Sequence, residues 1–196
     1  MALEVELKAH IADPRRLQVT LEGLEGISEA TAIDKQDCYI GPDADTFVVR
    51  LRSENDTLTI THKKRTIADG VETNQEIEFS TELRQKGAVL DLFAVLGYTE
   101  QLTKRKTGLR YTLEAVDELG PLTIEVCEVS PLGWFLEMEY LVDDPSLVEK
   151  ARRALLQTLS LVEIDRSLVE SRPYMNLLKE QGSEVRPQHQ GSEQRP

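Results

Sequence analysis

The stretch ALEVELKAH, residues 2–10, decides how the rest of the chain is read. Apolar and polar residues alternate along it, which is the pattern of a β-strand with two unlike faces. Glu4, Glu6 and Lys8 share one face, and leucine and valine side chains share the other. The charged face is either the wet side of a sheet or the wall of an internal site. The other strands of the chain decide between these two readings.

Composition narrows the class of protein. The chain has 196 residues, 40% hydrophobic and 30% charged, which predicts one domain with a core of its own. Its formal net charge of −12 argues against non-specific nucleic-acid binding but allows a local phosphate site. Cys38 and Cys127 form neither a disulfide scaffold nor a zinc motif, so a reducing, cytoplasmic setting is expected. We see no signal peptide and no apolar span, and expect no membrane partner.

Strand patterns recur along the chain and alternate with a few helical ones. Helices are predicted from Asp13-Pro14 to about Gly26, and over 82–96, 144–161 and 167–179. Further strands are predicted over 29–41, 46–54, 57–65, 71–80, 103–116, 121–129 and 133–142. About eight strands give an α+β class built on a largely antiparallel sheet. We assign residues 1–179 to one domain and expect 180–196, which repeats QGSE-x-RP, to be a disordered tail.

Charges two residues apart gather on one face of five strands. The pairs of like charge are Glu4 with Glu6, Arg50 with Arg52, Glu76 with Glu78 and Glu137 with Glu139, and Lys63 and Arg65 share a face in the same way. A solvated face explains this for one strand, but like charges repeated on five strands need opposite charges nearby. A closed barrel supplies them, with a lumen lined by both signs and helices over its apolar outer face.

A lumen of this composition suits a polyanion that is bound together with a divalent metal. Arginine and lysine bind phosphate oxygens, arginine in bidentate fashion. Carboxylates supply the oxygen ligands that Mg²⁺ or Mn²⁺ prefers. We therefore expect a phosphate-rich ligand and one of these two metals in the barrel.

A series of motifs in the chain resembles one family. Glu4-x-Glu6-x-Lys8 resembles the ExExK signature of the CYTH superfamily, the triphosphate tunnel metalloenzymes, which include class IV adenylyl cyclases, thiamine triphosphatases and inorganic triphosphatases. Other motifs follow in order: Asp37-x-Tyr39, VVRLR with Arg50 and Arg52, TITHK with Lys63, EIE at 76–78, KRK at 104–106, LGWFLEME with Glu137 and Glu139, and SRPYMNLL with Arg172 and Tyr174. Together they span residues 3 to about 178.

One position departs from the family pattern. The family usually has an aspartate in the strand before LG-x-F, where this chain has Cys127. Glu125 lies two residues earlier on the same strand face and is a candidate for the displaced carboxylate. Cys127 is alternatively a plain core residue, the usual fate of a single cysteine.

The resemblance implies an eight-stranded antiparallel tunnel that holds a triphosphate, and it implies roles for named residues. The residues that it implies as metal ligands are Glu4, Glu6, Glu137 and Glu139. The catalytic residues that it implies are Lys8, Arg50 and Lys63. Lys8 would either contact phosphate or activate the nucleophile. The substrate-binding residues that it implies are Arg52, Arg65, Lys104, Lys106, Arg172 and Tyr174. Glu76, Glu78 and Glu125 are implied as supporting residues of the site. Arg65 is alternatively a surface charge, and Tyr174 alternatively a packing residue.

The same site residues are compatible with two reactions. Attack of a ribose 3′-hydroxyl on the α-phosphorus of ATP gives cyclic AMP and pyrophosphate, and the length and the Arg-x-Tyr ending favour this cyclase reading. Attack of water on the terminal phosphorus makes the protein a triphosphatase for tripolyphosphate, thiamine triphosphate or nucleoside triphosphates. A polyphosphate-binding module without catalysis is the third reading. Small barrels of this kind often pair, so a homodimer is also an open expectation.

Overall fold

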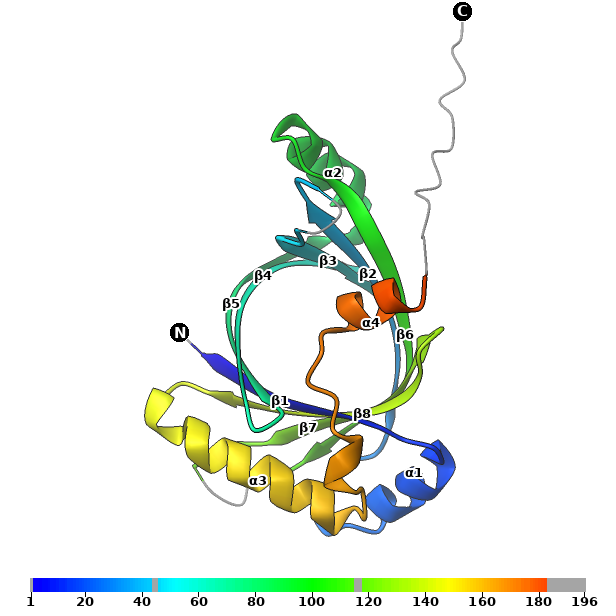
Figure 1. The fold of residues 1–196 in the computed structure, drawn as a ribbon, viewed down its shortest axis with the longest axis vertical. Helices are drawn as coiled ribbons and strands as arrows, with labels where there is room; N and C mark the ends of the chain where they lie inside the picture. Colours follow the sequence, from blue (N-terminus) through cyan, green and yellow to red (C-terminus); the bar gives the residue numbers. More distant parts are fainter. Residues whose placement is uncertain (1, 44–45, 115–117, 183–196) are drawn as a thin grey trace, which may run out of the picture.

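Eight antiparallel strands close into a barrel (Figure 1), as the alternating charges predicted. The structure is a computed structural model that describes residues 2–43, 46–114 and 118–182. Around the barrel the strand order is β1-β5-β4-β3-β2-β6-β7-β8. The strands are β1 (Leu3–His10), β2 (Thr31–Gly41), β3 (Val49–Glu54), β4 (Thr57–Ala68), β5 (Val71–Glu82), β6 (Thr99–Leu113), β7 (Leu122–Ser130) and β8 (Gly133–Val142).

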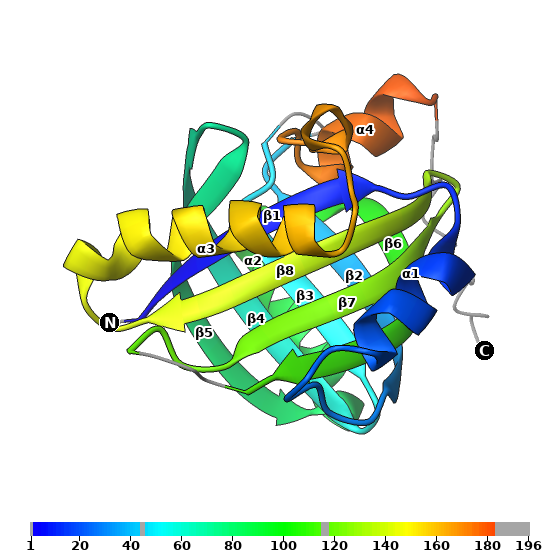
Figure 2. The ribbon, with the colours of Figure 1, turned by 90° about the horizontal axis from the view of Figure 1, so that it is seen from below.

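Four α-helices lie outside the strands or over the barrel opening (Figure 2). They are α1 (Pro14–Glu22), α2 (Lys86–Val95), α3 (Val148–Leu161) and α4 (Tyr174–Glu180), and short 3₁₀ turns precede α2 and α3. The predicted start of α1 is confirmed, because the side chain of Asp13 accepts a hydrogen bond from Arg16 N and Pro14 occupies the first turn. Gly97 ends the α2 region with a φ of +84°, a conformation that glycine adopts without strain.

The main apolar core lies outside the barrel. Alternate residues of β1, β7 and β8, such as Leu7, Ile124 and Met138, point outward and pack against α1 and α3. Leu155 and Leu21 are fully buried helix residues of the same cluster. Since the apolar sides of these strands are used on the outside, the polar sides must face the lumen. This division is what makes the interior a site rather than a core.

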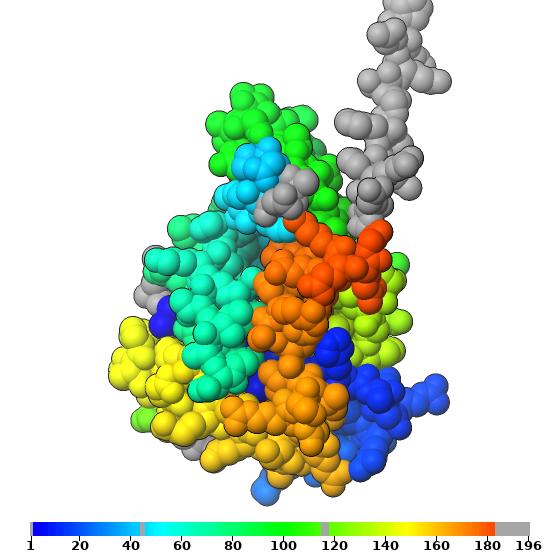
Figure 3. Space-filling view, viewed as in Figure 1, coloured from blue at the N-terminus to red at the C-terminus, as the bar shows by residue number. Residues whose placement is uncertain are grey.

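The C-terminal region differs from the predicted helix over 167–179. A 3₁₀ turn at Arg166–Leu168 is followed by an extended strap, and only Tyr174–Glu180 is helical. The strap is tied to β1, because Glu170 N donates to Lys8 O and Val169 bridges to Ala9. Pro173 explains the late start, since the residue before a proline avoids helical geometry and proline itself opens helices well. Figure 3 shows the strap and α4, in orange, lying across the near opening of the barrel.

The outer face of the barrel is covered less completely than predicted. Helix α2 packs on β2, β3 and β4 through Val89, Leu90 and Phe93. It does not reach the outward residues of β5, where Ile77 is 64% and Phe79 is 60% exposed. The expectation that helices cover the whole apolar face was therefore wrong for this strand.

Two sequence predictions concern residues that the structure does not describe. Most of the predicted tail lies outside the described residues, because only 180–182 of it belong to them. The predicted turn before β7 falls partly on residues 115–117, which also lie outside. Among the described residues, no helix is long and apolar enough to cross a membrane.

Candidate active site

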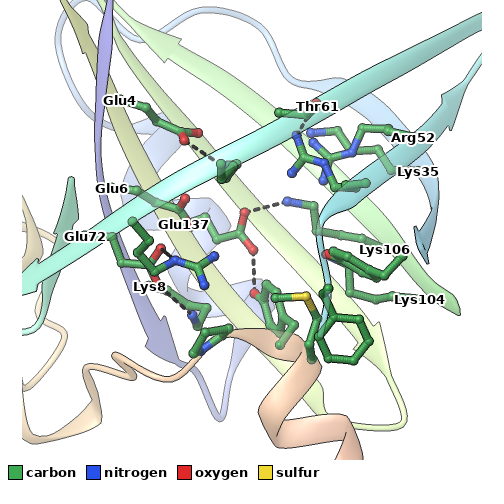
Figure 4. A pocket seen from close by; sticks show the side chains of 18 of the residues that line it. Glu4, Glu6, Lys8, Lys35, Arg52, Thr61, Glu72, Lys104, Lys106 and Glu137 are labelled. Carbon is green, nitrogen blue, oxygen red and sulfur yellow. Dashed lines mark hydrogen bonds and ion pairs between the residues drawn. The ribbon is translucent and has the colours of Figure 1, made fainter. Parts of the chain in front are cut away.

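A cavity runs through the lumen of the barrel, and charged side chains from all eight strands line it (Figure 4). Its volume is about 1010 Å³ when the open space at its mouth is included. The cationic lining residues are Lys8, Lys35, Arg50, Arg52, Lys63, Arg65, Lys104 and Lys106; the acidic ones are Glu4, Glu6, Glu72, Glu125, Glu137 and Glu139. Cations outnumber acids inside a protein whose net charge is −12, so the lumen concentrates positive charge.

The acidic side chains gather where β1 meets β8. Glu6 lies directly opposite Glu139 in the ladder, and Lys8 lies opposite Glu137. One carboxylate oxygen of Glu4 accepts hydrogen bonds from Lys63 Nζ at 2.5 Å and from Asn74 Nδ2 at 3.1 Å. The register thus brings the two glutamate pairs together on adjacent strands of the lumen wall.

Crowding of these carboxylates shifts their protonation. Burial, followed by the charges of Glu4, Glu137 and Glu72, raises the pKa of Glu6 to about 7, although Lys63 opposes the shift. Burial and the charge of Glu4 raise the pKa of Glu139 well above its usual value. Burial also disfavours the charge of Glu4, but the Lys63 ammonium outweighs it and lowers the pKa of that carboxyl. Protons therefore occupy part of a carboxylate cluster whose charge the nearby cations do not balance.

This cluster fits a divalent cation by its chemistry. Hard oxygen donors with raised pKa values are stabilised when a cation replaces their protons. In the arrangement described for residues 2–43, 46–114 and 118–182, no three histidine, cysteine or acidic side chains are already poised around a common metal position. Lys63 and Lys106 instead hold Glu4 and Glu137 by ion pairs of 2.5 Å each. Glu4, Glu6, Glu137 and Glu139 are the residues that would hold a metal ion, with the two lysines released toward an anion.

The opposite wall of the lumen is cationic and well ordered by buried acids. Arg52 makes a bidentate pair with Asp37, with distances of 2.7 and 2.9 Å from Nε and Nη2, and Lys104 Nζ lies 3.0 Å from the same carboxylate. Arg50 donates to Thr61 at 3.2 Å, and its buried Nε has no hydrogen-bond partner. An unsatisfied buried guanidinium nitrogen facing a cavity is suited to an incoming anion.

Tyr174 of α4 enters the lumen and joins the two walls. Its hydroxyl donates to Glu137, and its ring lies 4.7 Å from Lys8 Nζ and 4.4 Å from Lys104 Nζ. Lys8 Nζ also donates to the carbonyl oxygen of Arg172 at 2.9 Å. The helix thus closes one side of the site with a residue that contacts both an acid and two cations, which goes beyond simple packing.

The remaining predicted site residues lie at the edges of the cavity or outside it. Arg65 lines the cavity and pairs with Glu72 at 2.7 Å. Glu76 holds Lys63 at 2.5 Å, and Glu78 accepts from Thr61 at 2.7 Å, but neither belongs to the lining.

The side chain of Arg172 is 51% exposed and pairs with Glu170 and Glu180. In this arrangement the guanidinium of Arg172 lies outside the cavity, and only its backbone oxygen reaches a lining residue, Lys8.

The structure separates the two candidates for the displaced carboxylate. Cys127 is fully buried, packs with Phe135 and Tyr174, and donates from its thiol to a carboxylate oxygen of Glu137 at 4.0 Å. Glu125 lines the cavity and is held by Lys35 at 2.6 Å, Lys106 at 2.6 Å and Arg110 at 2.9 Å. In this arrangement Glu125 lies among cations, and Cys127 lies buried beside Glu137 and two aromatic rings.

Several lining residues were missed by the sequence reading. Lys35 and Glu72 line the cavity, and Asn74 supports Glu4 from a fully buried position. The signal for Lys35 was available, because it lies two residues before Asp37 and alternation places both on one face. For Asn74, alternation along the strand predicts only which face the residue lies on. A neutral amide two residues before Glu76 does not add to the pattern of charges that marks the site.

Comparison with protein families places this architecture. The model of the CYTH domain matches residues 2–174, which contain all eight strands, the strap and the first residue of α4. The chain belongs to the CYTH family. The family assignment from ExExK and the motifs that follow it is thereby confirmed.

Among curated proteins, this CYTH chain is similar to "Putative adenylate cyclase MJ0240" of Methanocaldococcus jannaschii. The two are 26% identical over 180 residues, which is 89% of this chain and 98% of the relative. The similarity therefore extends over most of this chain and nearly all of the relative.

Solved structures share the fold. The PH1012 protein of Pyrococcus horikoshii is 20% identical, with a TM-score of 0.70 over 89% of this chain and 98% of that one. The putative adenylyl cyclase HpAC1 from Hippeastrum, for which a dominant triphosphatase activity is described, is 16% identical, with a TM-score of 0.64 over 93% of this chain and 96% of that one. At these identities the likeness shows the tunnel fold.

Proposed function

We propose that this CYTH protein is a divalent-metal-dependent enzyme that acts on a triphosphate inside the barrel, with ATP cyclisation to cyclic AMP and pyrophosphate as its reaction. The observation that carries the proposal is the division of one lumen into a carboxylate wall and a cationic wall. Phosphoryl and nucleotidyl transfer depend mainly on positioning and charge neutralisation, which such a lumen supplies without a covalent intermediate.

The residues have separable tasks in this proposal. Arg50, Arg52, Lys104 and Lys106 bind and orient the phosphate oxygens. Glu4, Glu6, Glu137 and Glu139 hold Mg²⁺ or Mn²⁺, which when bound neutralises phosphate charge and polarises the reacting phosphorus. Lys63 bridges the walls, because its ammonium pairs with Glu4 and Glu76 and can turn toward an anion once a metal ion neutralises Glu4.

The mouth beside α4 favours a substrate with an organic group. Phe47, Val48, Met175 and Pro173 line the cavity there, and Tyr39 lies edge-on to Phe47 with ring centroids 6.0 Å apart. An apolar rim next to a cationic wall suits a nucleoside attached to a triphosphate. The relative named as an adenylate cyclase supports the same reading.

Triphosphate hydrolysis is the second candidate. The same walls stabilise attack of water on the terminal phosphorus, and HpAC1, a protein of this fold, is described with a dominant triphosphatase activity. The two reactions differ only in which nucleophile lies in line with which phosphorus. A binding module without turnover is the third candidate.

A substrate panel decides among them. We would incubate the full chain with Mg²⁺ and then Mn²⁺, offer ATP, tripolyphosphate and thiamine triphosphate, and resolve cyclic AMP, pyrophosphate and orthophosphate. Cyclic AMP from ATP is the expected result. Orthophosphate together with pyrophosphate from tripolyphosphate, without cyclic AMP from ATP, would replace the cyclase by a triphosphatase. Metal-dependent binding without any product would indicate the binding module.

A further inference from the structure

One rung of the barrel places two ammonium groups face to face in the interior. Lys35 on β2 and Lys106 on β6 are direct partners in the ladder, and they are only 4% and 2% exposed. The next rung on the same face pairs opposite charges, Asp37 and Lys104, at 3.0 Å. Like charges directly opposed in a sheet are destabilising unless an anion lies between them. The Lys35–Lys106 rung therefore needs an anion.

Glu125 is the anion in the structure, but it is shared. Its carboxylate lies 2.6 Å from both ammonium groups and 2.9 Å from Arg110 Nε. Lys106 has a second acid in Glu137, and Arg110 has one in Glu54. For Lys35, by contrast, Glu125 is the one ion-pair partner found among the described residues. Among the three cations that share Glu125, the positive charge is therefore least compensated at Lys35.

The position of Lys35 continues the path of the other cations. Tyr39, four residues along β2, packs against α4 at one end of the cavity, so Lys35 lies roughly 13 Å further along the strand. Lys104 flanks the Tyr174 ring at that end, and Lys106 lies one step beyond Lys104 on the same face of β6. In Figure 4, Lys35 lies beside Arg52, across the lumen from Glu4 and Glu6.

We propose that Lys35 is a further substrate-binding residue, which contacts a phosphate group together with Lys106, and that Glu125 holds this place until the phosphate enters. The inference rests on the proposed triphosphate substrate and adds one contact to it. It also assigns Glu125 as a displaceable counter-ion rather than a metal ligand. Burial, and then the charges of Lys106 and Arg52, lower the pKa of Lys35 to about 8, a cost that a bound phosphate would relieve.

Binding of imidotriphosphate, a tripolyphosphate analogue with P–N–P links that resist hydrolysis, tests the inference by calorimetry on the full chain with Mg²⁺. We expect Lys35→Gln to raise Kd about 10- to 100-fold, the loss of one charge-assisted contact. Arg105→Gln is the matched control, because Arg105 lies on the outer face of the adjacent strand, paired with Asp34. It should change Kd less than twofold.

We expect Glu125→Gln to change the Kd for imidotriphosphate in the opposite direction to Lys35→Gln. A counter-ion that competes with phosphate should, when neutralised, lower Kd by about tenfold. If Glu125 were a metal ligand, the same variant would raise Kd and weaken the Mg²⁺ dependence, which would overturn the inference. An equal Kd for Lys35→Gln and the wild type would also overturn it. Should Glu125→Gln fail to fold, the comparison of Lys35→Gln with Arg105→Gln still decides.

If the proposed function itself were wrong, the experiments would give a different set of results. A wild-type protein that binds no imidotriphosphate and turns over no triphosphate rejects the substrate class itself. A wild-type protein that binds the analogue, with Lys35→Gln binding it equally well, rejects only the role of Lys35.

Discussion

The phenol of Tyr174 donates a hydrogen bond to a carboxylate oxygen of Glu137, so the helix that covers the lumen is tied to the wall that would hold the metal. The bond is partly buried, and the Tyr174 ring is flanked by the ammonium groups of Lys8 and Lys104. The side chain of Tyr174 thus both helps to close the barrel and orients the carboxylate of Glu137.

Tyr174→Phe should remove this bond while keeping the ring and its two cation contacts. We expect the free energy of unfolding to fall by about 1.5–3 kcal/mol, because a charged acceptor loses a buried donor. Metal-dependent turnover should fall as Glu137 loses its orientation, with a higher Mg²⁺ requirement. Chemical denaturation and Mg²⁺ titrations of activity measure the two effects.

Tyr111→Phe is the matched control for that variant. Tyr111 is buried on the outer side of the barrel and donates to Glu22 at 3.2 Å, far from the lumen acids. It should lose stability with no change in the Mg²⁺ requirement. Equal effects of both variants on the Mg²⁺ requirement would show that Tyr174 acts on stability alone.

Glu6→Gln should separate metal binding from stability. The pKa of Glu6 is raised to about 7, so the folded state binds more protons than the unfolded state between about pH 4.5 and 7. Stability of the wild type therefore falls as pH rises through this window, by about 1–3 kcal/mol from this group. The variant should lose that pH dependence and be the more stable protein at pH 8, while metal-dependent turnover falls at least about 100-fold.

The control for Glu6→Gln is Glu128→Gln. Glu128 is an exposed glutamate of β7, next along the chain to Cys127 and on the other face of the strand. Its neutralisation should change neither the pH profile of unfolding nor the activity. Retention of full metal-dependent turnover by Glu6→Gln would contradict the assignment of Glu6 to the metal.

Period-two alternation was enough to predict the barrel and the direction of most charges. The KRK run shows this well, since alternation places Lys104 and Lys106 inward and Arg105 outward, as found. Most strands bury their outward side under a helix, and there the signal is strong; β5, whose Ile77 and Phe79 are exposed, is the exception. Such a pattern gives the face of a residue but not its neighbours across the lumen.

What the sequence could not predict depends on contacts between distant strands. Glu125 was expected to support a metal site, yet three cations from β2 and β6 surround it. Arg172 was assigned to the substrate because of the motif around it, but its guanidinium turns toward Glu170 and Glu180. Both outcomes follow from which strand or helix lies next in space, and that information is absent from a single strand pattern.

Glu170→Gln should loosen the strap without entering the lumen. Hydrogen bonds from Arg172, with a further one from His10, lower the pKa of Glu170 to about 2 despite its partial burial. This stabilisation is complete above about pH 4.5 and is lost as pH falls toward 2. We expect the variant to unfold about 2–4 °C lower at pH 7, and the difference to vanish near pH 2.

Scanning calorimetry at pH 7, 4 and 2.5 follows this difference. Glu180→Gln removes the exposed partner of Arg172 and serves as control, since solvent screens that pair and little change is expected at any pH. A difference between Glu170→Gln and wild type that stays constant with pH would exclude the charged pair as its cause.

Cys127→Asp tests whether this cysteine replaces a metal ligand or fills the core. Cys127 is 0% exposed, and burial followed by the charge of Glu137 raises the pKa of its thiol to about 12. A carboxylate at the same place meets the aromatic rings of Phe135 and Tyr174 and the like charge of Glu137, so we expect a loss of about 3 kcal/mol or more in unfolding free energy.

Cys127→Ala keeps the site apolar and should cost only about 1 kcal/mol. Chemical denaturation of both variants and the Mg²⁺ dependence of their activity distinguish a core residue from a replaced metal ligand. A destabilised aspartate variant with unchanged Mg²⁺ affinity supports the core role. If the aspartate variant instead bound Mg²⁺ more tightly and gained turnover, Cys127 would stand where a metal ligand belongs, and the carboxylate set at β1 and β8 would be incomplete without it.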